Sequence, residues 1–174
     1  MSEFHIALTG HRPNKLAGYN LNTPYYLNMH KKLVEIITDL TKTYDVVWVH
    51  SGMALGADTV WACAARTAIK KFPERVKLYA EIPVMTQPDA WFKQEDKQRW
   101  QDSVDVASDR TIYANTYSPR VLQERNIGMI DHADLLVAIW DGTSGGTGNA
   151  VKYAKSVHKD MVSYHPDEFK PVSH

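Results

Sequence analysis

The sequence predicts an α/β fold: a single-domain, Rossmann-like, doubly wound and mainly parallel sheet with helices on both faces. Apolar, strand-like runs alternate with helix-like segments along the whole chain, as is typical of parallel sheets covered by helices. Most of these runs lack the polar alternation of a half-exposed strand, which indicates burial on both faces. Right-handed crossovers then give the doubly wound arrangement. With 174 residues, one domain spanning residues 1–174 is expected.

The first half of the chain predicts strands and helices in strict alternation. Residues 4–8 are apolar and predict the first strand. Thr23 is followed by a proline, and this cap-then-proline pattern begins a helix. Residues 45–50 are rich in β-branched side chains and predict the second strand, and an apolar face that ends near Phe72 predicts the next helix. Residues 75–82, closed by a proline, predict the third strand.

The middle of the chain combines polar residues with two tryptophans. Residues 88–102 predict a polar helix anchored by Trp91 and Trp100. Residues 104–106 predict a brief fourth strand. Ser118 precedes a proline and repeats the helix-start pattern.

The C-terminal part contains the segment around which the chain is organised. Residues 135–140 form an apolar run that predicts a strand, and after a glycine-rich turn the apolar spacing predicts a helix to about His158. Residues 161–164 predict a last strand. The final ten residues, 165–174, are expected to be loosely attached.

The glycine-rich turn after residues 135–140 is a candidate phosphate-binding loop. Its backbone amides and the positive end of the next helix dipole would lie at the carboxyl end of a strand, where an anion can bind. It lacks the spacing of the dinucleotide fingerprint and the lysine of a Walker A loop. A purely structural helix entry is the alternative. The candidate ligand-binding residues of this turn are Asp141, Gly142, Gly145, Gly146, Thr147, Gly148 and Asn149.

Two other strands end in small or polar residues, and a parallel sheet brings these turns to the same edge. In the turn after residues 45–50, small residues allow close approach of a ligand or tight strand–helix packing, and the carboxylate either bonds ribose hydroxyls or caps the helix. The turn after residues 4–8 offers a guanidinium, the bidentate partner of phosphate. A surface arginine beside a histidine in a turn is the alternative. The candidate residues are Ser51, Gly52, Ala54, Gly56 and Asp58 in the first of these turns and Thr9, Gly10, His11 and Arg12 in the second.

Arg125 lies among the apolar positions of its predicted helix, next to Asn126, and both are candidate ligand-binding residues. A guanidinium in such a place needs a carboxylate or a ligand, and Asp131 or Asp134 is a candidate structural partner. We interpret His50 as a satisfied strand-end residue rather than a base. The eight histidines are scattered and form no motif typical of a metal site.

The composition is that of an ordinary globular protein and limits the function classes. Hydrophobic residues make up 44% and charged residues 23%, and 20 basic side chains balance 20 acidic ones. Zero net charge argues against nucleic acid as a partner, because that binding depends on clustered Lys and Arg. The single cysteine, Cys63, cannot form an internal disulfide, and no apolar run approaches a membrane span. We therefore expect a cytoplasmic protein with no membrane contact.

Four motifs together resemble the YpsA family, a branch of the SLOG superfamily, which takes its name from the Smf/DprA and LOG proteins. The motifs follow one another in the family's order over nearly the whole chain: T-G-H-R-P, S-G-M-A-L-G-A-D, Tyr117 with R-N-x-x-M-I-D, and A-D-L-L-V-A-I-W-D-G-x-x-G-G-T-x-N-A-V-x-Y-A. The family is known from bacteria and their phages. The resemblance implies a Rossmann-like domain that binds nucleotides or nucleotide-derived ligands.

Two groups of relatives bear on catalysis. LOG phosphoribohydrolases, which release the base from a nucleoside monophosphate, carry an arginine matched here by Arg125 and a glycine loop whose glutamate is catalytic. Asn149 stands where their loop threonine would be, and Val151 and Lys152 occupy the region of the acid. Ala150 stands where the similar nucleoside deoxyribosyltransferases have their glutamate. Cleavage of an N-glycoside by the relatives' mechanism therefore lacks its carboxylate.

We therefore expect a protein that binds a nucleotide or a derivative, such as a nucleoside monophosphate, NAD or ADP-ribose, for sensing or sequestration. The alternative is a nucleotide N-glycosidase in which Asp58 or Asp141 replaces the missing acid. Single-stranded DNA binding in the manner of DprA is a lesser alternative that fits the S-G-x-A-x-G-x-D string. No cofactor and no metal are expected. Homo-oligomerisation is expected from the tryptophan-bearing helices and from relatives that dimerise.

Overall fold

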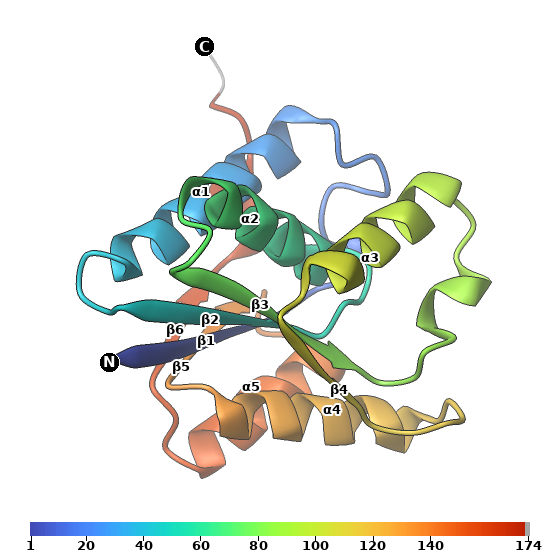
Figure 1. Ribbon diagram of the computed structural model, residues 1–174. Coiled ribbons are helices and arrows are strands. Elements are labelled where there is room, and N and C mark those ends of the chain that lie inside the picture. The colour runs from blue at the N-terminus through green and yellow to red at the C-terminus, as the bar shows by residue number, and fades with distance from the viewer. Residues whose placement is uncertain (173–174) are drawn as a thin grey trace.

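The computed structural model describes residues 1–172, and in this part of the chain six parallel strands form one sheet in the order β4-β3-β2-β1-β5-β6 (Figure 1). The chain builds outward from the centre to one edge and then returns to the other side of β1. The predicted doubly wound, Rossmann-like fold is confirmed. The strands are β1 (Glu3–Gly10), β2 (Val46–Ser51), β3 (Val76–Ile82), β4 (Asp109–Ile112), β5 (Leu135–Ile139) and β6 (Met161–Tyr164).

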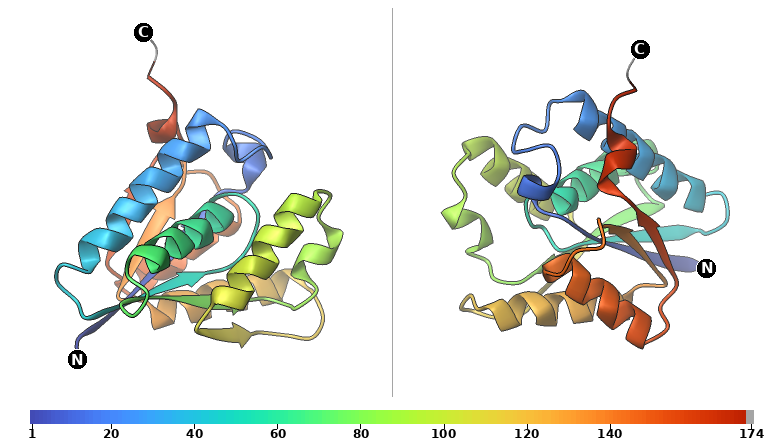
Figure 2. Two further views of the ribbon diagram at one scale, coloured as in Figure 1. Left: turned by 45° about the horizontal axis from the view of Figure 1, so that its top comes forward. Right: turned by 180° about the vertical axis from the view of Figure 1, so that it is seen from behind.

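Helices cover both faces of the sheet. Helices α1, α2 and α3 lie on one face, and α4 and α5 lie on the other (Figures 1 and 2). Within residues 1–172, no helix combines the length and the apolarity that crossing a bilayer would require. The helices are α1 (Pro24–Leu40), α2 (Ala57–Lys71), α3 (Gln94–Val106), α4 (Pro119–His132) and α5 (Gly146–Ser156), and the short 3-10 helices are η1 (Pro13–Lys15), η2 (Gln87–Ala90) and η3 (Pro166–Phe169).

The core explains why the central strands read as uninterrupted apolar runs. Along β1, Ile6 and Leu8 join the large core under α1 and α2, whereas Ala7 between them joins the smaller core under α4 and α5. Both faces of the strand are therefore buried, so no polar alternation is needed. Trp61 of α2 is fully buried in the larger core, and its Nε1 donates to the carbonyl of His50 at 2.8 Å.

The region of the fourth strand differs from the expectation. The strand predicted at residues 104–106 is wrong, because α3 extends to Val106 and β4 begins at Asp109. Val104 packs from α3 against the core cluster that contains Trp100, so its apolar character serves the helix. The true strand D-R-T-I is largely exposed on the sheet edge and therefore lacks an apolar signal. Trp100 faces inward, with its Nε1 donating to Gln87 at 2.9 Å, and offers no surface to a second chain.

The C-terminal segment is held more firmly than expected. Phe169 of η3 is only 4% exposed and belongs to the core under α1. The hydroxyl of Tyr25 donates to the carbonyl of Pro166 at 2.8 Å, which ties η3 to α1 (Figure 2). The predicted loose attachment is therefore wrong for residues 165–169. Ser173 and His174 lie outside the described residues.

Candidate ligand-binding site

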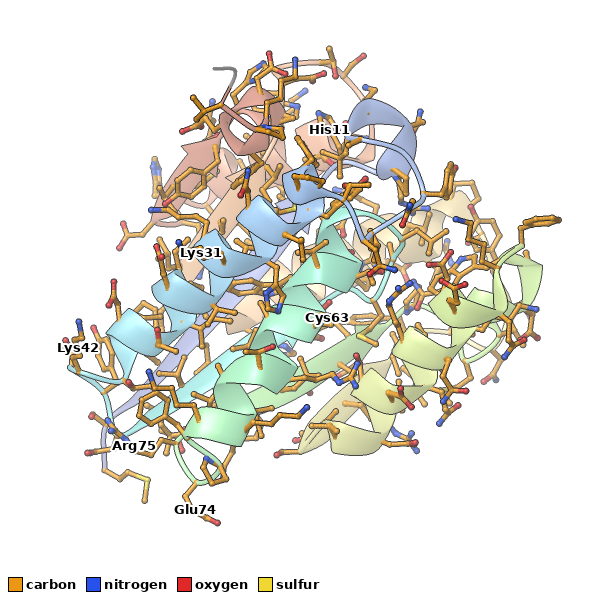
Figure 3. The ribbon with its side chains drawn as sticks, turned by 90° about the horizontal axis from the view of Figure 1, so that it is seen from above. His11, Lys31, Lys42, Cys63, Glu74 and Arg75 are labelled. Atoms are coloured by element: carbon orange, nitrogen blue, oxygen red, sulfur yellow. The ribbon has the colours of Figure 1, made fainter. Side chains whose placement is uncertain are left out.

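A pocket of about 390 Å³ lies at the carboxyl edge of the sheet, beside the point where β1 separates β2 from β5. This is the topological switch point, where ligands of doubly wound sheets bind. Figure 3 shows His11 at this end of the molecule and Lys42, Glu74 and Arg75 at the opposite end. The predicted residues that line the pocket are Thr9, Gly10, His11, Arg12, Ala54, Asp58, Arg125, Asn126, Gly145, Gly146 and Thr147. The predicted residues that lie outside its lining are Ser51, Gly52, Gly56, Asp141, Gly142, Gly148 and Asn149.

The glycine-rich turn forms one wall of the pocket. Gly145, at φ 139° and ψ −164°, is the N-cap of α5, a backbone conformation that favours glycine. A Cβ added to Gly145 or Gly146 would meet no atom within 4 Å, so space rather than protein faces these positions. The first amides of a helix have no partner within the helix and carry its positive dipole end. This wall is therefore suited to an anion.

Asp141 lies outside the pocket lining and holds this turn through hydrogen bonds to Thr143. Its Oδ1 accepts hydrogen bonds from the hydroxyl and the amide of Thr143, at 2.5 and 3.0 Å, and lies 2.8 Å from His11 Nε2. Lys15 Nζ donates to the hydroxyl of Thr143 at 2.7 Å. The hydrogen bonds from Thr143, helped by His11, hold the pKa of Asp141 far below its usual range. Asp141 therefore fixes the turn and is poorly suited to donate a proton.

The turn after β1 is clamped against the start of α2. The carbonyl of His11 accepts from the amide of Ala57 at 3.1 Å. A Cβ on Gly10 would lie 2.5 Å from Cβ of Ala57, and a Cβ on Gly56 would lie 2.5 Å from the carbonyl oxygen of His11. Gly10 and Gly56 therefore permit close packing between the two turns. The small residues after β2 were expected to serve either the approach of a ligand or tight strand–helix packing, and at Gly56 the structure shows tight packing.

Arg125 reaches the pocket from α4 and is only 4% exposed. Its Nη1 donates to the carbonyl of Gly52, and its Nε donates to Oδ1 of Asn126 at 2.9 Å. The buried carboxylate of Asp58 lies close to this guanidinium, because a Cβ on Gly52 would be 2.7 Å from Arg125 Nη1 and 2.9 Å from Asp58 Oδ2. The prediction that this guanidinium lies among apolar positions of its helix is confirmed.

The structural partners proposed for Arg125 are wrong. Asp131 accepts from the hydroxyl of Tyr153 at 2.6 Å, and Asp134 accepts from the amide of His5 at 2.8 Å. Both carboxylates are used to fasten α4 and the start of β5 to their neighbours. The carboxylate whose charge acts most strongly on Arg125 is that of Asp58. Asp58 lies at the start of α2, so the spacing of residues along α4 cannot reveal it.

Asp58 is 7% exposed and lines the pocket from the first turn of α2. Burial raises its pKa above the usual range, although the charges of Arg125 and Arg12 act in the opposite direction. Its Oδ2 accepts from the amide of Ala54 at 3.3 Å, while the N-cap of α2 is Gly56. The carboxylate thus stabilises the turn after β2 rather than occupying the helix cap.

A second cavity of about 400 Å³ adjoins the first, and the two share Arg12, Ala54 and Leu122 in their walls. Two aromatic residues, Trp91 and Tyr117, line the second cavity but not the first. From the sequence, Trp91 is expected to anchor a helix, and a tryptophan near a polar helix gives no sign of the cavity that it lines. Tyr117 belongs to the third of the four family motifs, and its place in this cavity gives that motif a structural position.

The fold and this pocket define the class of protein: a Rossmann-like domain with a glycine turn facing the switch point of its sheet. The chain belongs to the YpsA family, because the model described as the YspA SLOG family matches residues 6–169. The uncharacterized SPbeta prophage-derived protein YoqJ of Bacillus subtilis (strain 168) is 28% identical over 162 residues. That alignment covers 84% of this chain and 93% of YoqJ.

Two solved structures of DNA processing protein A share the fold. DprA from Helicobacter pylori, studied for its single-stranded DNA binding mode, superposes with a TM-score of 0.63 at 16% identity, over 93% of this chain and 65% of that one. DprA from Streptococcus pneumoniae gives a TM-score of 0.61 at 14% identity, over 92% and 50%. This chain thus spans 65% and 50% of the two DprA chains. At these identities the likeness shows the fold.

Proposed function

We propose that this chain binds a nucleotide or a nucleotide-derived ligand, with a phosphate against the first turn of α5, for sensing or sequestration. The observation that carries the proposal is the open wall at Gly145 and Gly146, which shares one pocket with the guanidiniums of Arg12 and Arg125. Free helix amides and guanidiniums are the two protein groups best matched to phosphate oxygens. Membership of the SLOG superfamily supports the same ligand class.

The adjoining cavity supports a ligand that also carries an aromatic base. A nucleotide whose phosphate lies at the glycine turn can extend past Arg12 toward Trp91 and Tyr117. Aromatic side chains stack on bases, and Asp89 in the same cavity offers carboxylate oxygens to base edges. Each cavity is about the size of a small-molecule site. A ligand with two parts, such as ADP-ribose or NAD, would use both.

The test is a panel of ligands measured by thermal shift and by calorimetry. We expect AMP, GMP, NAD or ADP-ribose to raise the melting temperature, and adenosine, which has no phosphate, to bind at least roughly tenfold more weakly than AMP. Arg12→Ala should weaken binding, and the exposed Lys152→Ala should not. If no member of the panel binds, or if adenosine binds as well as AMP, the proposal is wrong.

Hydrolysis of the ligand is the alternative, and one observation favours it. Asp58 is a buried carboxylate with a raised pKa beside Arg125, which is the environment of a general acid. The same panel, analysed for free base by chromatography, separates binding from cleavage. Release of base that disappears in Asp58→Asn and persists in Asp141→Asn would make the protein an N-glycosidase with Asp58 as its acid.

Single-stranded DNA is the remaining alternative, favoured by the shared fold with the DprA of Helicobacter pylori. The neutral composition argues against it. A labelled oligonucleotide whose electrophoretic mobility is shifted by the protein at low salt, and less at high salt, would support DNA binding.

Light scattering on the same sample tests the expected homo-oligomer, for which the fully exposed ring of Phe92 is the clearest apolar contact.

A further inference from the structure

A second polar cluster lies on the face of the sheet that α4 covers, away from the pocket. It brings together His50 of β2, Glu81 of β3 and His132 at the end of α4. Figure 1 shows α4 against the face of the sheet that contains β2 and β3. Nδ1 of His50 and Nδ1 of His132 each lie 2.9 Å from the same carboxylate oxygen, Oε2 of Glu81. Three elements far apart in sequence therefore aim their donor atoms at one point.

Within residues 1–172, the carboxylate of Glu81 has no lysine or arginine within ion-pairing distance. Its side chain is 0% exposed, and burial alone would raise its pKa, but hydrogen bonds from His50, His132 and Tyr113 outweigh burial and lower the pKa. Among the described residues, the groups within ion-pairing distance of the carboxylate are the two histidines, and an imidazole is a cation only when protonated. A buried carboxylate of this kind needs a positive charge nearby.

We propose that His50 Nδ1, Glu81 Oε2 and His132 Nδ1 bind one divalent transition-metal ion of the zinc class. The three donor atoms lie within 4.8 Å of one another. Ligands about 2.1 Å from a tetrahedral zinc ion lie about 3.4 Å apart, so a small widening of the present spacing admits the ion. Two imidazoles and a carboxylate form a donor set that zinc favours. The side chain of His132 is 44% exposed, so solvent reaches this donor and can supply a fourth ligand.

The surroundings of these donors fit metal binding. Nε2 of His50 lies 2.7 Å from Nδ1 of His5, so a His50 bound to metal through Nδ1 can donate its other ring proton to His5. The hydroxyl of Tyr113 donates to the second oxygen of Glu81, Oε1, at 2.8 Å. Ligating histidines and carboxylates are held by outer hydrogen bonds of this type. The cluster thus contains both the donors and the groups that orient them.

Metal binding would also act on the pocket through α4. His132 ends the helix that carries Arg125 and Asn126 into the pocket. An ion held between His132 and the two strands would fasten this end of α4 to the sheet. The geometry therefore assigns the ion a structural role in which the open fourth position holds water.

The test uses the full chain, stripped with a chelator and titrated with zinc and with cobalt. We expect one ion per chain, a visible cobalt spectrum of the tetrahedral type, and a higher melting temperature with zinc. His132→Ala, at an exposed side chain, should weaken zinc binding by at least about tenfold. His30→Ala changes a histidine on α1 that bonds Thr67, and it should leave zinc binding unchanged.

Two results would overturn the zinc site: absence of stoichiometric binding, or equal affinity in the parent and His132→Ala proteins. Glu81→Gln provides a second variant that keeps the shape of the side chain, and circular dichroism checks that it folds. Loss of zinc binding in a folded Glu81→Gln protein supports the site. A parent protein whose stability responds to pH but not to zinc would mean that a proton, and not a metal, neutralises Glu81.

Discussion

Two turns of similar composition meet at the carboxyl edge of the sheet, and they use their glycines in opposite ways. In the turn after β2, a Cβ on Gly52 or Gly56 would lie within 3 Å of other protein atoms. In the turn after β5, a Cβ on Gly142, Gly145 or Gly146 would meet nothing within 4 Å, and only Gly148, inside α5, is closely packed, against the carbonyl oxygen of Thr143. The first turn is closed by protein, whereas the second opens into the pocket.

The difference shows what a glycine-rich string means at a strand end. Glycine is needed where two backbones approach closely and also where a ligand approaches a backbone, and composition does not separate these cases. What separates them is the group on the other side. Gly56 faces the backbone of His11, while Gly146 faces empty space beside Arg125. Substitution of these glycines should therefore affect stability in one turn and affinity in the other.

The largest effect is expected for Gly56→Ala. At φ +90°, with the added Cβ 2.5 Å from the carbonyl oxygen of His11, both the backbone strain and the clash oppose folding. We expect the free energy of unfolding to fall by about 4 kcal/mol, measured by urea denaturation. Gly18→Ala is the matched control, because its φ of +84° is similar but no atom lies within 4 Å. It should cost about 1 kcal/mol, and equal losses in the two variants would mean that packing against His11 is unimportant.

The second prediction concerns the opposite charges of Arg125 and Asp58, which lie together beside Gly52. Arg125→Met would leave Asp58 buried without its main positive neighbour, and we expect a loss of about 3 kcal/mol in the free energy of unfolding at neutral pH. Adding Asp58→Asn should recover part of that loss, because the uncompensated charge disappears. A double variant as unstable as the sum of the two single variants would show that the charges do not interact.

The sequence predicts the sheet, most helices and the edge at which the pocket lies, because these depend on periodicity and on parallel topology. It fails at β4, whose polar residues lie on an exposed edge and carry no apolar signal. It also predicts the wrong partners for Arg125, because only carboxylates close to Arg125 in the sequence can be considered, whereas Asp58 belongs to α2. The cluster around Glu81 was invisible for the same reason, since its donors come from β2, β3 and α4. Which distant segments come into contact depends on the order of the strands and on their register in the sheet. A single sequence does not reveal either.

The third prediction tests the open turn. Gly146→Ala should leave the stability unchanged or slightly higher, because alanine favours the helix and the new Cβ meets no atom within 4 Å. The same methyl group would occupy space beside the first amides of α5, so we expect affinity for the phosphate-bearing ligand to fall roughly tenfold. Calorimetry and thermal melting on one preparation measure both quantities. A variant with lower stability and unchanged affinity would mean that this turn is closed in the way that the turn after β2 is.

The smallest effect is expected for Asp141, which supports the open turn from outside the pocket. Its pKa is lowered in the folded protein by hydrogen bonds from Thr143 and by His11, so its ionised form stabilises the fold. That contribution is complete above the unfolded pKa of about 3.9 and is lost as the pH falls through the lower, folded pKa. Asp141→Asn should therefore lower the melting temperature by a few degrees at neutral pH, and the difference from the parent protein should shrink below about pH 4. A difference that stays constant between neutral and acidic pH would mean that the hydrogen-bonding shape of the side chain, and not its charge, holds the turn open.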